Sequence, residues 1–444
     1  MATRGQGAGP SRNPHRHFVA RSLALVAVSG LVLAACSNAS TKASSGGSGA
    51  PGVSAHSIVV GSLASATGSL SSGFGEIVDG VQAYFDKVNA EGGVYGRKLD
   101  LAYQANDTGN PTTDADLART LVDQDHVFAV VGVGTPFFTG SQFLAQSGTP
   151  TFGYVVSSNW DNAPTLFGTY GSYLNYSTSQ YDVVYVAKQL HATSVALVSY
   201  GVPASADACE GSAQGLKRAG INVGFEDFNF SIGGSPVPDV LQMVAHHVDL
   251  LVTCMEGSDN LSFARTMHQY GLGSAHAIWF NGYSRQIAAD YPSLMDGVIF
   301  LDQHVPFEAP GAFPGKYPAM VTYLDTMERY EPQWTYDDVA FQGYVNAAQF
   351  VAGLKAAGPD LTQAKLVKAI NSETAFTAGG LMPPVNWTLD HTLAGTTSGP
   401  YCSAFVEAED GHYVPVFTQP HGQVFTCVNK DFQVVAPPAG TPGT

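Results

Sequence analysis

The sequence predicts an α/β protein with two doubly wound lobes, each built on a parallel sheet. Three observations lead to this class. Strands and helices alternate along most of the chain, several strands are continuous apolar runs, and the alternation restarts near the middle. Parallel strands need crossover helices, and a sheet covered on both faces needs apolar strands. With 444 residues, the chain is long enough for two such domains.

The first βαβ unit lies between residues 57 and 107. Residues 57–63 form a short apolar run, which predicts a buried strand. A turn-rich loop, 64–75, follows it, and from Glu76 onward apolar residues recur at helical spacing. Glycines at 92 and 93 end this helix, and residues 97–103 alternate as a second strand. Strand, helix and strand in about 50 residues commit the chain to a parallel sheet.

The same rhythm continues through both predicted lobes. In the first lobe we expect helices at 113–122 and up to 144, and strands at 127–133 and 151–156. In the second we expect helices over 181–190, 204–219, 240–247 and 260–270, and strands over 194–199, 221–225, 249–254 and 277–280. After a strand at 298–301, three helices follow, at 316–330, 339–357 and 362–370. The end is β-rich, with strands at 401–407, 412–417 and 424–428, and residues 433–444 are expected to be disordered.

Composition and charge exclude several classes of partner. The net charge is −16, only 13% of residues are charged, and 45% are hydrophobic. This composition is typical of a globular protein, and its acidity argues against nucleic acid or an anionic membrane surface as partners.

The N-terminus predicts export and a lipid anchor. A basic region up to Arg21 precedes an apolar run at 23–35, which is too short to span a bilayer and suits a signal-peptide core. The small residues before Cys36 resemble a bacterial lipobox, so residues 1–35 are predicted to be a lipoprotein signal peptide, with Cys36 lipidated. Residues 36–56 are predicted to be a flexible tether. We therefore expect a protein attached to the outer face of the bacterial cytoplasmic membrane by this anchor alone; the alternative is an ordinary signal peptide with an incidental cysteine.

The four remaining cysteines predict two disulfides, because their number is even in an exported chain. Three pairings are possible. Cys254 ends a strand and Cys209 lies just inside the helix after a neighbouring strand, whereas Cys402 and Cys427 lie on strands of the β-rich end. This favours Cys209–Cys254 and Cys402–Cys427.

No catalytic, cofactor or metal motif is present. The sequence lacks GxSxG, HExxH and GxxxxGK[ST], and its cysteines have no CxxC spacing. Gly132 and Gly134 follow a strand, but Phe137 stands where a dinucleotide fingerprint has its third glycine. We therefore expect a protein that is not an enzyme, without cofactor or metal. The remaining candidate site is the set of loops at the carboxyl ends of the parallel strands, where open α/β sheets bind ligands.

Several motifs resemble the type I periplasmic binding proteins, specifically the leucine/isoleucine/valine-binding branch. They are Ile58-Val-Val-Gly61, Thr67-Gly68, the run from Asn89 to Lys98 (NAEGGVYGRK), Asn106-Asp107 and Gly379-Gly380-Leu381. The resemblance implies two lobes joined by a three-strand hinge, 57–170 with 303–380 and 171–302 with 381–432. It also implies capture of a solute for the permease of an ABC importer, by a protein expected to be a monomer. A ligand-sensing receptor domain of the same fold, signalling to a membrane partner, is one alternative, and an exported enzyme on a doubly wound scaffold is another.

The resemblance also carries ligand contacts onto this chain. They are an aromatic at Phe74, carboxylate-binding loops with Thr135, Phe137, Ser157 and Ser158, and second-lobe contacts at Tyr200, Glu256 and Tyr283. Pro136 and Phe137 stand where the family usually has small hydroxyl residues, and residues 281–284 contain no acid. We therefore expect a small amphipathic solute, amide- or amino-acid-like, with leucine, isoleucine and valine as poor ligands. Glu256 is the expected partner of a positive group, with Asp259 in reserve.

Overall fold

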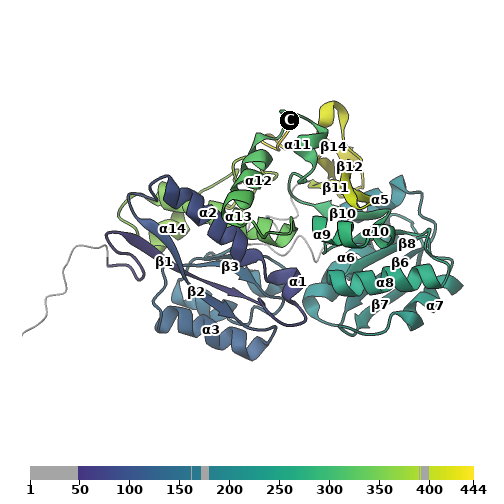
Figure 1. Ribbon diagram of the computed structural model, residues 1–444, viewed down its shortest axis with the longest axis horizontal. Helices are drawn as coiled ribbons and strands as arrows, with labels where there is room; N and C mark the ends of the chain where they lie inside the picture. Colours follow the sequence, from purple (N-terminus) through teal and green to yellow (C-terminus); the bar gives the residue numbers. More distant parts are fainter. Residues whose placement is uncertain (1–48, 162, 172–179, 390, 392–399) are drawn as a thin grey trace, which may run out of the picture. The chain divides into compact units, whose positions relative to one another are not determined.

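The computed structural model describes residues 49–161, 163–171, 180–389, 391 and 400–444 (Figure 1). The predicted signal peptide, the lipidation site Cys36 and residues 36–48 of the predicted tether lie outside the described residues. Residues 49–56 of that tether turn back onto the first strand: Val59 donates its N–H to the Gly52 carbonyl at 2.8 Å, and Val53 bridges Ile58. The predicted tether is therefore held against the fold in its last part.

The first sheet contains five parallel strands in the order β2-β1-β3-β4-β5. Helices α2 and α13 pack together on one face and α3 lies on the other, as Figure 1 shows. The strands are β1 (Ser57–Ala64), β2 (Lys98–Asn106), β3 (Val130–Gly134), β4 (Thr151–Gly153) and β5 (Leu166–Gly168). The helices between them are α1 (Ser71–Phe74), α2 (Ile77–Ala90), α3 (Pro111–Asp123), α4 (Ser141–Ser147) and the 3₁₀ turn η1 (Ser158–Trp160).

A glycine bulge in β3 shifts the alternation of its side chains. Val131 packs in the core beneath α2 and α13, whereas Val133 packs with Leu121 of α3 on the opposite face. Between them Gly132 has φ +84°, and a Cβ there would lie 2.9 Å from Val81 of α2. A side chain at this position would meet both backbone strain and a steric clash. The bulge directs the end of β3 toward the loop at 135–138.

The second sheet has the order β14-β13-β11-β10-β9-β8-β6-β7, with β12 paired to β11. Strands β6, β7, β8, β9 and β10 are parallel to one another. Strands β11, β12, β13 and β14 join the sheet in antiparallel pairs. Its strands are β6 (Val195–Tyr200), β7 (Val223–Phe230), β8 (Leu250–Cys254), β9 (His276–Trp279), β10 (Val298–Asp302), β11 (Tyr401–Glu409), β12 (His412–Val416), β13 (Thr426–Val428) and β14 (Val434–Val435).

Helices cover both faces of the parallel part, as the apolar strands predict. Along β6, Val195 and Leu197 pack with the core under α5 and α6, whereas Ala196 and Val198 pack with the core under α7 and α8. This alternation is the period-two pattern of a strand buried on both faces. The helices are α5 (Tyr181–Gln189), α6 (Pro203–Arg218), α7 (Val237–Ala245), α8 (Gly257–Gln269), α9 (Arg285–Asp290) and α10 (Pro292–Met295).

The segment after β10 returns to the first sheet. It comprises α11 (Ala309–Ala312), α12 (Pro318–Tyr330), α13 (Asp338–Ala357) and α14 (Gln363–Ile370). Helix α13 contacts α2, β3 and β4, and its apolar side chains are buried around most of its circumference. Asp337 caps it by accepting the Ala340 N–H at 2.9 Å. The chain then comes back to the second sheet as β11, antiparallel to β10.

The disulfides agree with the predicted pairing, whereas the C-terminal tail differs from its predicted disorder. The sulfurs of Cys402 and Cys427 are bonded, across directly paired residues of β11 and β13, and Cys209 is bonded to Cys254. This is the pairing that the sequence favours. The segment 433–444 differs from its predicted disorder, because β14 pairs with β13 and Gln423 donates to the Pro442 carbonyl at 3.0 Å. Among the described residues, no helix is long and apolar enough to cross a bilayer.

Candidate functional site

A pocket lies at the carboxyl ends of the parallel strands of both sheets. Loops after β1, β3 and β4 line it from the first sheet, and loops after β6, β8, β9 and β10 line it from the second. The first turn of α13 adds Asp338 and Gln342. Its volume is about 120 Å³, close to the ~150 Å³ cavity that binds a benzene molecule. The site is therefore sized for a small molecule.

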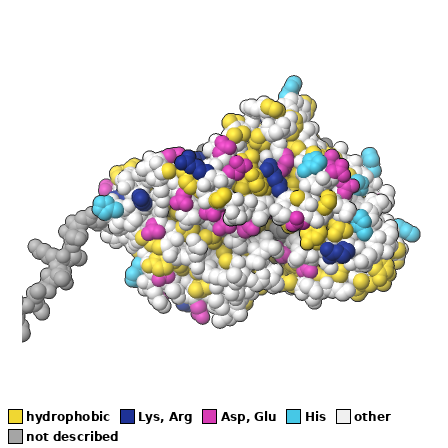
Figure 2. Space-filling view, viewed as in Figure 1, with side chains coloured by type: hydrophobic (Ala, Val, Ile, Leu, Met, Phe, Trp, Pro, Cys, Tyr) yellow, Lys and Arg dark blue, Asp and Glu magenta, His cyan; other side chains and the backbone are white. Residues whose placement is uncertain are grey.

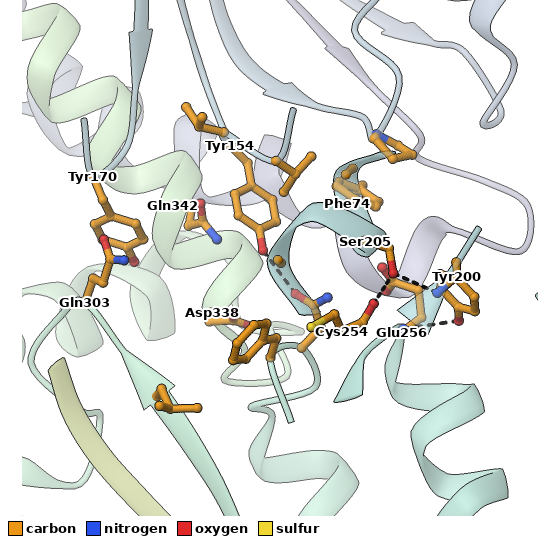
Figure 3. Close-up of a pocket in the computed structure, with 18 of the residues that line it drawn as sticks. Phe74, Tyr154, Tyr170, Tyr200, Ser205, Cys254, Glu256, Gln303, Asp338 and Gln342 are labelled. Carbon is orange, nitrogen blue, oxygen red and sulfur yellow. Dashed lines mark hydrogen bonds between the residues drawn. The ribbon is translucent and has the colours of Figure 1, made fainter. Parts of the chain in front are cut away.

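Four of the eight predicted contact residues line this pocket, and four do not. Phe74, Phe137, Tyr200 and Glu256 are lining residues, joined by Tyr154, Phe280 and Asn281. Figure 3 shows Phe74, Tyr200 and Glu256 at one end of the pocket and Tyr170 and Gln303 at the other. Phe74 and Tyr154 form an aromatic pair with ring centroids 5.8 Å apart. Aromatic side chains form part of the walls, which suits a solute with an apolar body.

The predicted carboxylate-binding hydroxyls lie outside the pocket lining. Thr135 is fully buried, and its Oγ1 is 3.5 Å from Ser65 Oγ and accepts the Phe137 N–H at 3.4 Å. Ser157 is buried, with an Oγ that has no described partner, and Ser158 is exposed at the start of η1. Pro136 and Phe137 face the pocket instead. The hydroxyl groups of Thr135, Ser157 and Ser158 are therefore not part of the cavity lining.

Tyr283 belongs to an aromatic cluster beside the pocket rather than to its lining. Its ring packs against Phe300 and Phe307, with centroids 5.8 and 4.9 Å away. Its hydroxyl donates to Glu308 and accepts the Phe307 N–H at 3.1 Å. Arg285 pairs with the same carboxylate at 2.8 Å. These contacts occupy the polar end of Tyr283 within the protein.

A hydrogen-bond network fixes the second-sheet end of the pocket. Tyr200 donates to Asp259 at 2.6 Å and accepts the Glu256 N–H at 3.2 Å. Asp259 also accepts the Gly233 N–H at 3.0 Å, so its carboxylate is engaged by internal donors. The side chain of Glu256 lies under α1, where Ser72 hydrogen-bonds its carboxyl group and Gly73 leaves room for it. Its Oε2 has no partner among the described residues.

A family model described as periplasmic binding protein matches residues 57–412. The chain belongs to the periplasmic binding protein family. This finding and the sheet topology confirm the family and the type I fold that the sequence predicts. No match was found among curated protein sequences.

Solved structures share the fold of this periplasmic binding protein at low sequence identity. A fatty acid ABC transporter substrate-binding protein from Thermomonospora curvata is 19% identical, with a TM-score of 0.68 over 88% of this chain and 97% of that one. A leucine binding protein from Thermotoga maritima MSB8 is 13% identical, with a TM-score of 0.67 over 85% and 100%. An ABC transporter solute binding protein from R. palustris, in complex with benzoate, is 15% identical, with a TM-score of 0.67 over 84% and 98%.

The described lining of the pocket in this periplasmic binding protein contains several acids but no lysine or arginine. Four carboxyl groups line it, and among the described lining residues there is no lysine or arginine; the acids are Asp182, Glu256, Asp302 and Asp338. The segments 172–179 and 392–399 contain no lysine or arginine in their sequence. The whole chain has 36 acidic and 20 basic residues, and acids are also the more frequent on the face drawn in Figure 2. An anionic solute would find no cationic partner here.

Burial raises the pKa of each of these acids. Loss of hydration raises the pKa of Glu256 to about 8, with Asp338 and Asp259 adding repulsion. Burial also raises the pKa of Asp338 to about 8 and that of Asp182 to about 6. The pKa of Asp302 is raised well above its ordinary value by burial, then by Asp338 and Glu308. Unpaired buried carboxylates are costly, so Glu256, Asp302 and Asp338 favour the protonated form until a donor or cation arrives.

Sequence reasoning missed the pocket residues contributed by β10 and α13. Asp302 is the last residue of β10, Gln303 and His304 follow it, and Gln342 lies within α13. One available signal was the position of Asp302 at the carboxyl end of a strand parallel to β9. Gln342 carried no such signal, because a polar residue inside a helix usually faces solvent.

The Cys209–Cys254 disulfide lies at the edge of the pocket. Cys254 ends β8 and lines the cavity, and Ser205 of α6 donates to its carbonyl oxygen. Ser205 also accepts the Tyr200 N–H at 2.8 Å. Together these bonds tie the start of α6 to the ends of β6 and β8.

Proposed function

We propose that this periplasmic binding protein captures a small amphipathic solute, amino-acid-like or amide, and delivers it to the permease of an ABC importer. The observation that carries the proposal is the pocket at the carboxyl ends of both parallel sheets, lined by aromatic side chains together with polar and acidic ones. This is the place and character of ligand sites in open α/β folds. Two of the solved structures with this fold are named as ABC transporter proteins that bind a solute or substrate.

The choice of solute rests on the polar groups of the pocket. Phe74 and Phe137 are the proposed apolar walls, and Glu256 is the proposed acceptor for a donor group of the solute. Fatty acids and benzoate, named for two of the solved relatives, are carboxylates. A carboxylate here would meet four acids and no lysine or arginine among the described lining residues, and so would the α-carboxylate of leucine, isoleucine or valine. We therefore propose these amino acids as poor ligands and uncharged amides as better ones.

We further propose that the protein works outside the cytoplasm as a monomer anchored by lipid at Cys36. The apolar run before Cys36 supports this proposal. The two disulfides also support it, because such bonds persist in oxidising compartments.

Solute binding is tested by a thermal-shift screen, followed by calorimetry on protein that has been unfolded to remove bound ligand and refolded with its disulfides intact. The library contains amino acids, their amides, neutral amides, amines and small carboxylates. A library member that raises the melting temperature and binds in calorimetry with micromolar or tighter affinity supports the proposal. Submicromolar binding of leucine would contradict the proposed solute, and no binding by any member would contradict the function.

A further inference from the structure

The pocket has a second polar end, away from Glu256, where unpartnered acceptors gather. Asp302 Oδ2, His304 Nε2 and Gln342 Oε1 have no hydrogen-bond partner among the described residues. Their side chains are 6%, 1% and 2% exposed, and all three residues line the pocket. Figure 3 shows Gln342 and Gln303 at this end, across the cavity from Glu256 and Tyr200. A buried acceptor without a donor is unfavourable. His304 lies 3.8 Å from Asp302 and its ring stacks on Phe341, the residue before Gln342, so the three unpartnered atoms belong to one region of the pocket and indicate a missing partner.

The histidine is an acceptor at this site. Its Nδ1 lies 2.8 Å from the Val305 carbonyl oxygen, which can only accept, so Nδ1 carries the hydrogen. Burial lowers the pKa of His304 to about 4, which leaves the ring neutral and Nε2 with a free lone pair. Nε2 is 3.8 Å from the Asp302 carboxyl group, too far for a hydrogen bond. The ring is also fixed in place, since it stacks on Phe341 with centroids 4.0 Å apart.

The chemistry of this end selects a particular partner. It presents an amide oxygen, an imidazole nitrogen and a carboxyl oxygen, with no described lysine or arginine in the pocket. A primary ammonium has three N–H donors and one positive charge, and therefore matches three acceptors of which one is an acid. A hydroxyl supplies one donor and a carboxylate none.

We propose that Asp302, His304 and Gln342 form a subsite for a primary ammonium group, and hence that the solute is an amine. This inference rests on the proposed solute-binding function and specifies its ligand class. It places the ammonium at the end of β10, and not at Glu256, which the sequence favours for a positive group. Glu256, beneath α1, then receives an uncharged donor.

A series of probes sharing one isobutyl group tests the subsite by calorimetry on the ligand-stripped full-length protein. The probes are isoamylamine, isoamyl alcohol, isovaleramide and isovalerate. A charged hydrogen bond is worth about 1.5–3 kcal/mol, so isoamylamine is expected to bind roughly 10- to 100-fold more tightly than isoamyl alcohol. Isovalerate is expected to bind most weakly. Equal or tighter binding of the alcohol or of isovalerate would overturn the proposal.

Variants then locate the ammonium. Asp302→Asn keeps the shape of the side chain and is expected to reduce the preference for amine over alcohol to nearly one. Gln342→Met removes a neutral acceptor and is expected to reduce it several-fold. Asp114→Asn is the matched control, because Asp114 is equally buried but lies outside the pocket and accepts the Gly140 N–H. The control is expected to keep the full preference, and melting curves show that each variant is folded.

The possible outcomes separate this inference from the proposed function. If the preference for amine survives Asp302→Asn, or disappears in Glu256→Gln instead, the subsite is misassigned. If a library solute without a basic nitrogen binds and isoamylamine does not, solute binding stands and the ammonium site is overturned. If neither the probes nor any library solute binds, both proposals fail.

Discussion

Buried carboxyl groups set the chemistry of the pocket at the scale of single residues. Glu256 is 4% exposed and Asp302 6%, and both carry an oxygen without a described partner. A hydrated carboxylate would be ionised at neutral pH, but each of these loses its hydration on folding. The cost appears as a raised pKa in the folded protein, and therefore as a stability that depends on pH.

Glu256→Gln should make the stability less dependent on pH. The folded pKa of Glu256, about 8, is above the ordinary 4.5, so the folded protein keeps a proton that the unfolded chain releases. The contribution of this raised pKa to the free energy of unfolding is complete below pH 4.5 and is lost as the pH rises through 8. Between these two pH values the glutamate lowers the free energy of unfolding by about 3 kcal/mol, and this decrease is absent in Glu256→Gln. Urea unfolding at pH 5 and pH 8 measures the difference.

The control for this prediction is Glu210→Gln at an exposed position of α6. It should leave the pH dependence of the wild type unchanged. Equal pH dependence in Glu256→Gln and the wild type would show that the carboxyl group of Glu256 is ionised in the folded protein.

Tyr283→Phe should destabilise the protein without weakening solute binding. The substitution leaves the Phe307 N–H without its acceptor and Glu308 without one of its donors. A buried group left unsatisfied costs about 1–3 kcal/mol. Tyr291, 39% exposed, provides the control Tyr291→Phe, which should change stability by less than about 0.5 kcal/mol. Chemical denaturation measures both, and a tenfold loss of solute affinity in Tyr283→Phe would instead place the hydroxyl in the site.

At the scale of elements, two glycines let α2 and α13 approach each other closely. A Cβ on Gly80 would collide with the Ala340 carbonyl oxygen, and one on Gly343 with the Ile77 carbonyl oxygen. Gly343 has the helical backbone that alanine prefers, so the cost of a substitution there is steric. This contact positions the first turn of α13, which carries Asp338 and Gln342 to the pocket.

Gly343→Ala should therefore destabilise the fold, although alanine is the better helix former. Overpacking costs about 1–3 kcal/mol, which exceeds the helix-propensity gain of roughly 1 kcal/mol. Gly311→Ala in α11 is the control, because a Cβ there has open space. Thermal unfolding should show a lower melting temperature for Gly343→Ala and no decrease for Gly311→Ala. An unchanged melting temperature for both would mean that the helices move apart without cost.

At the scale of the whole molecule, the chain passes between the two sheets more than once. It leaves the first sheet after β5, enters the second through β6, returns through α13 and comes back as β11. The pocket is lined by residues from both sheets. A solute that contacts both sides binds best to the arrangement in which both sides reach it, and it shifts the population toward that arrangement.

Binding should consequently reduce the radius of gyration of the protein in solution. Small-angle scattering on the ligand-stripped protein, with and without a saturating solute from the screen, measures the change. A non-binding member of the same library serves as control and should leave the curve unaltered. An unchanged radius of gyration at saturation would contradict closure around the solute.

Cys36→Ala should release the protein from the membrane or block its processing, if Cys36 carries the lipid. Fractionation of expressing bacterial cells, with mass spectrometry of the N-terminal peptide, measures both. The control is Ser37→Ala, which leaves every cysteine in place and should change neither membrane attachment nor processing. Membrane retention and an unchanged mass in Cys36→Ala would refute the anchor.

Local sequence patterns were sufficient to predict the fold class and the family, and they favoured the disulfide pairing that the structure contains. Apolar strands, helical spacing and glycine stops are local patterns, and Cys402 and Cys427 lie on strands that the pattern identifies. The same reasoning reached Phe74, Phe137, Tyr200 and Glu256, because each follows the carboxyl end of a strand or begins a loop there. These are short-range properties of the chain.

Which loop residues line the cavity, and which residues from other segments join them, depends on tertiary contacts. The backbone after β3 turns Phe137 toward the pocket and buries Thr135 against Ser65. Asp302 and Gln342 line the same pocket although β10 belongs to one sheet and α13 packs on the other. The tail forms β14 because β13 offers it an unpaired edge. Each of these outcomes depends on contacts between segments far apart in sequence, which periodicity and local propensity do not encode.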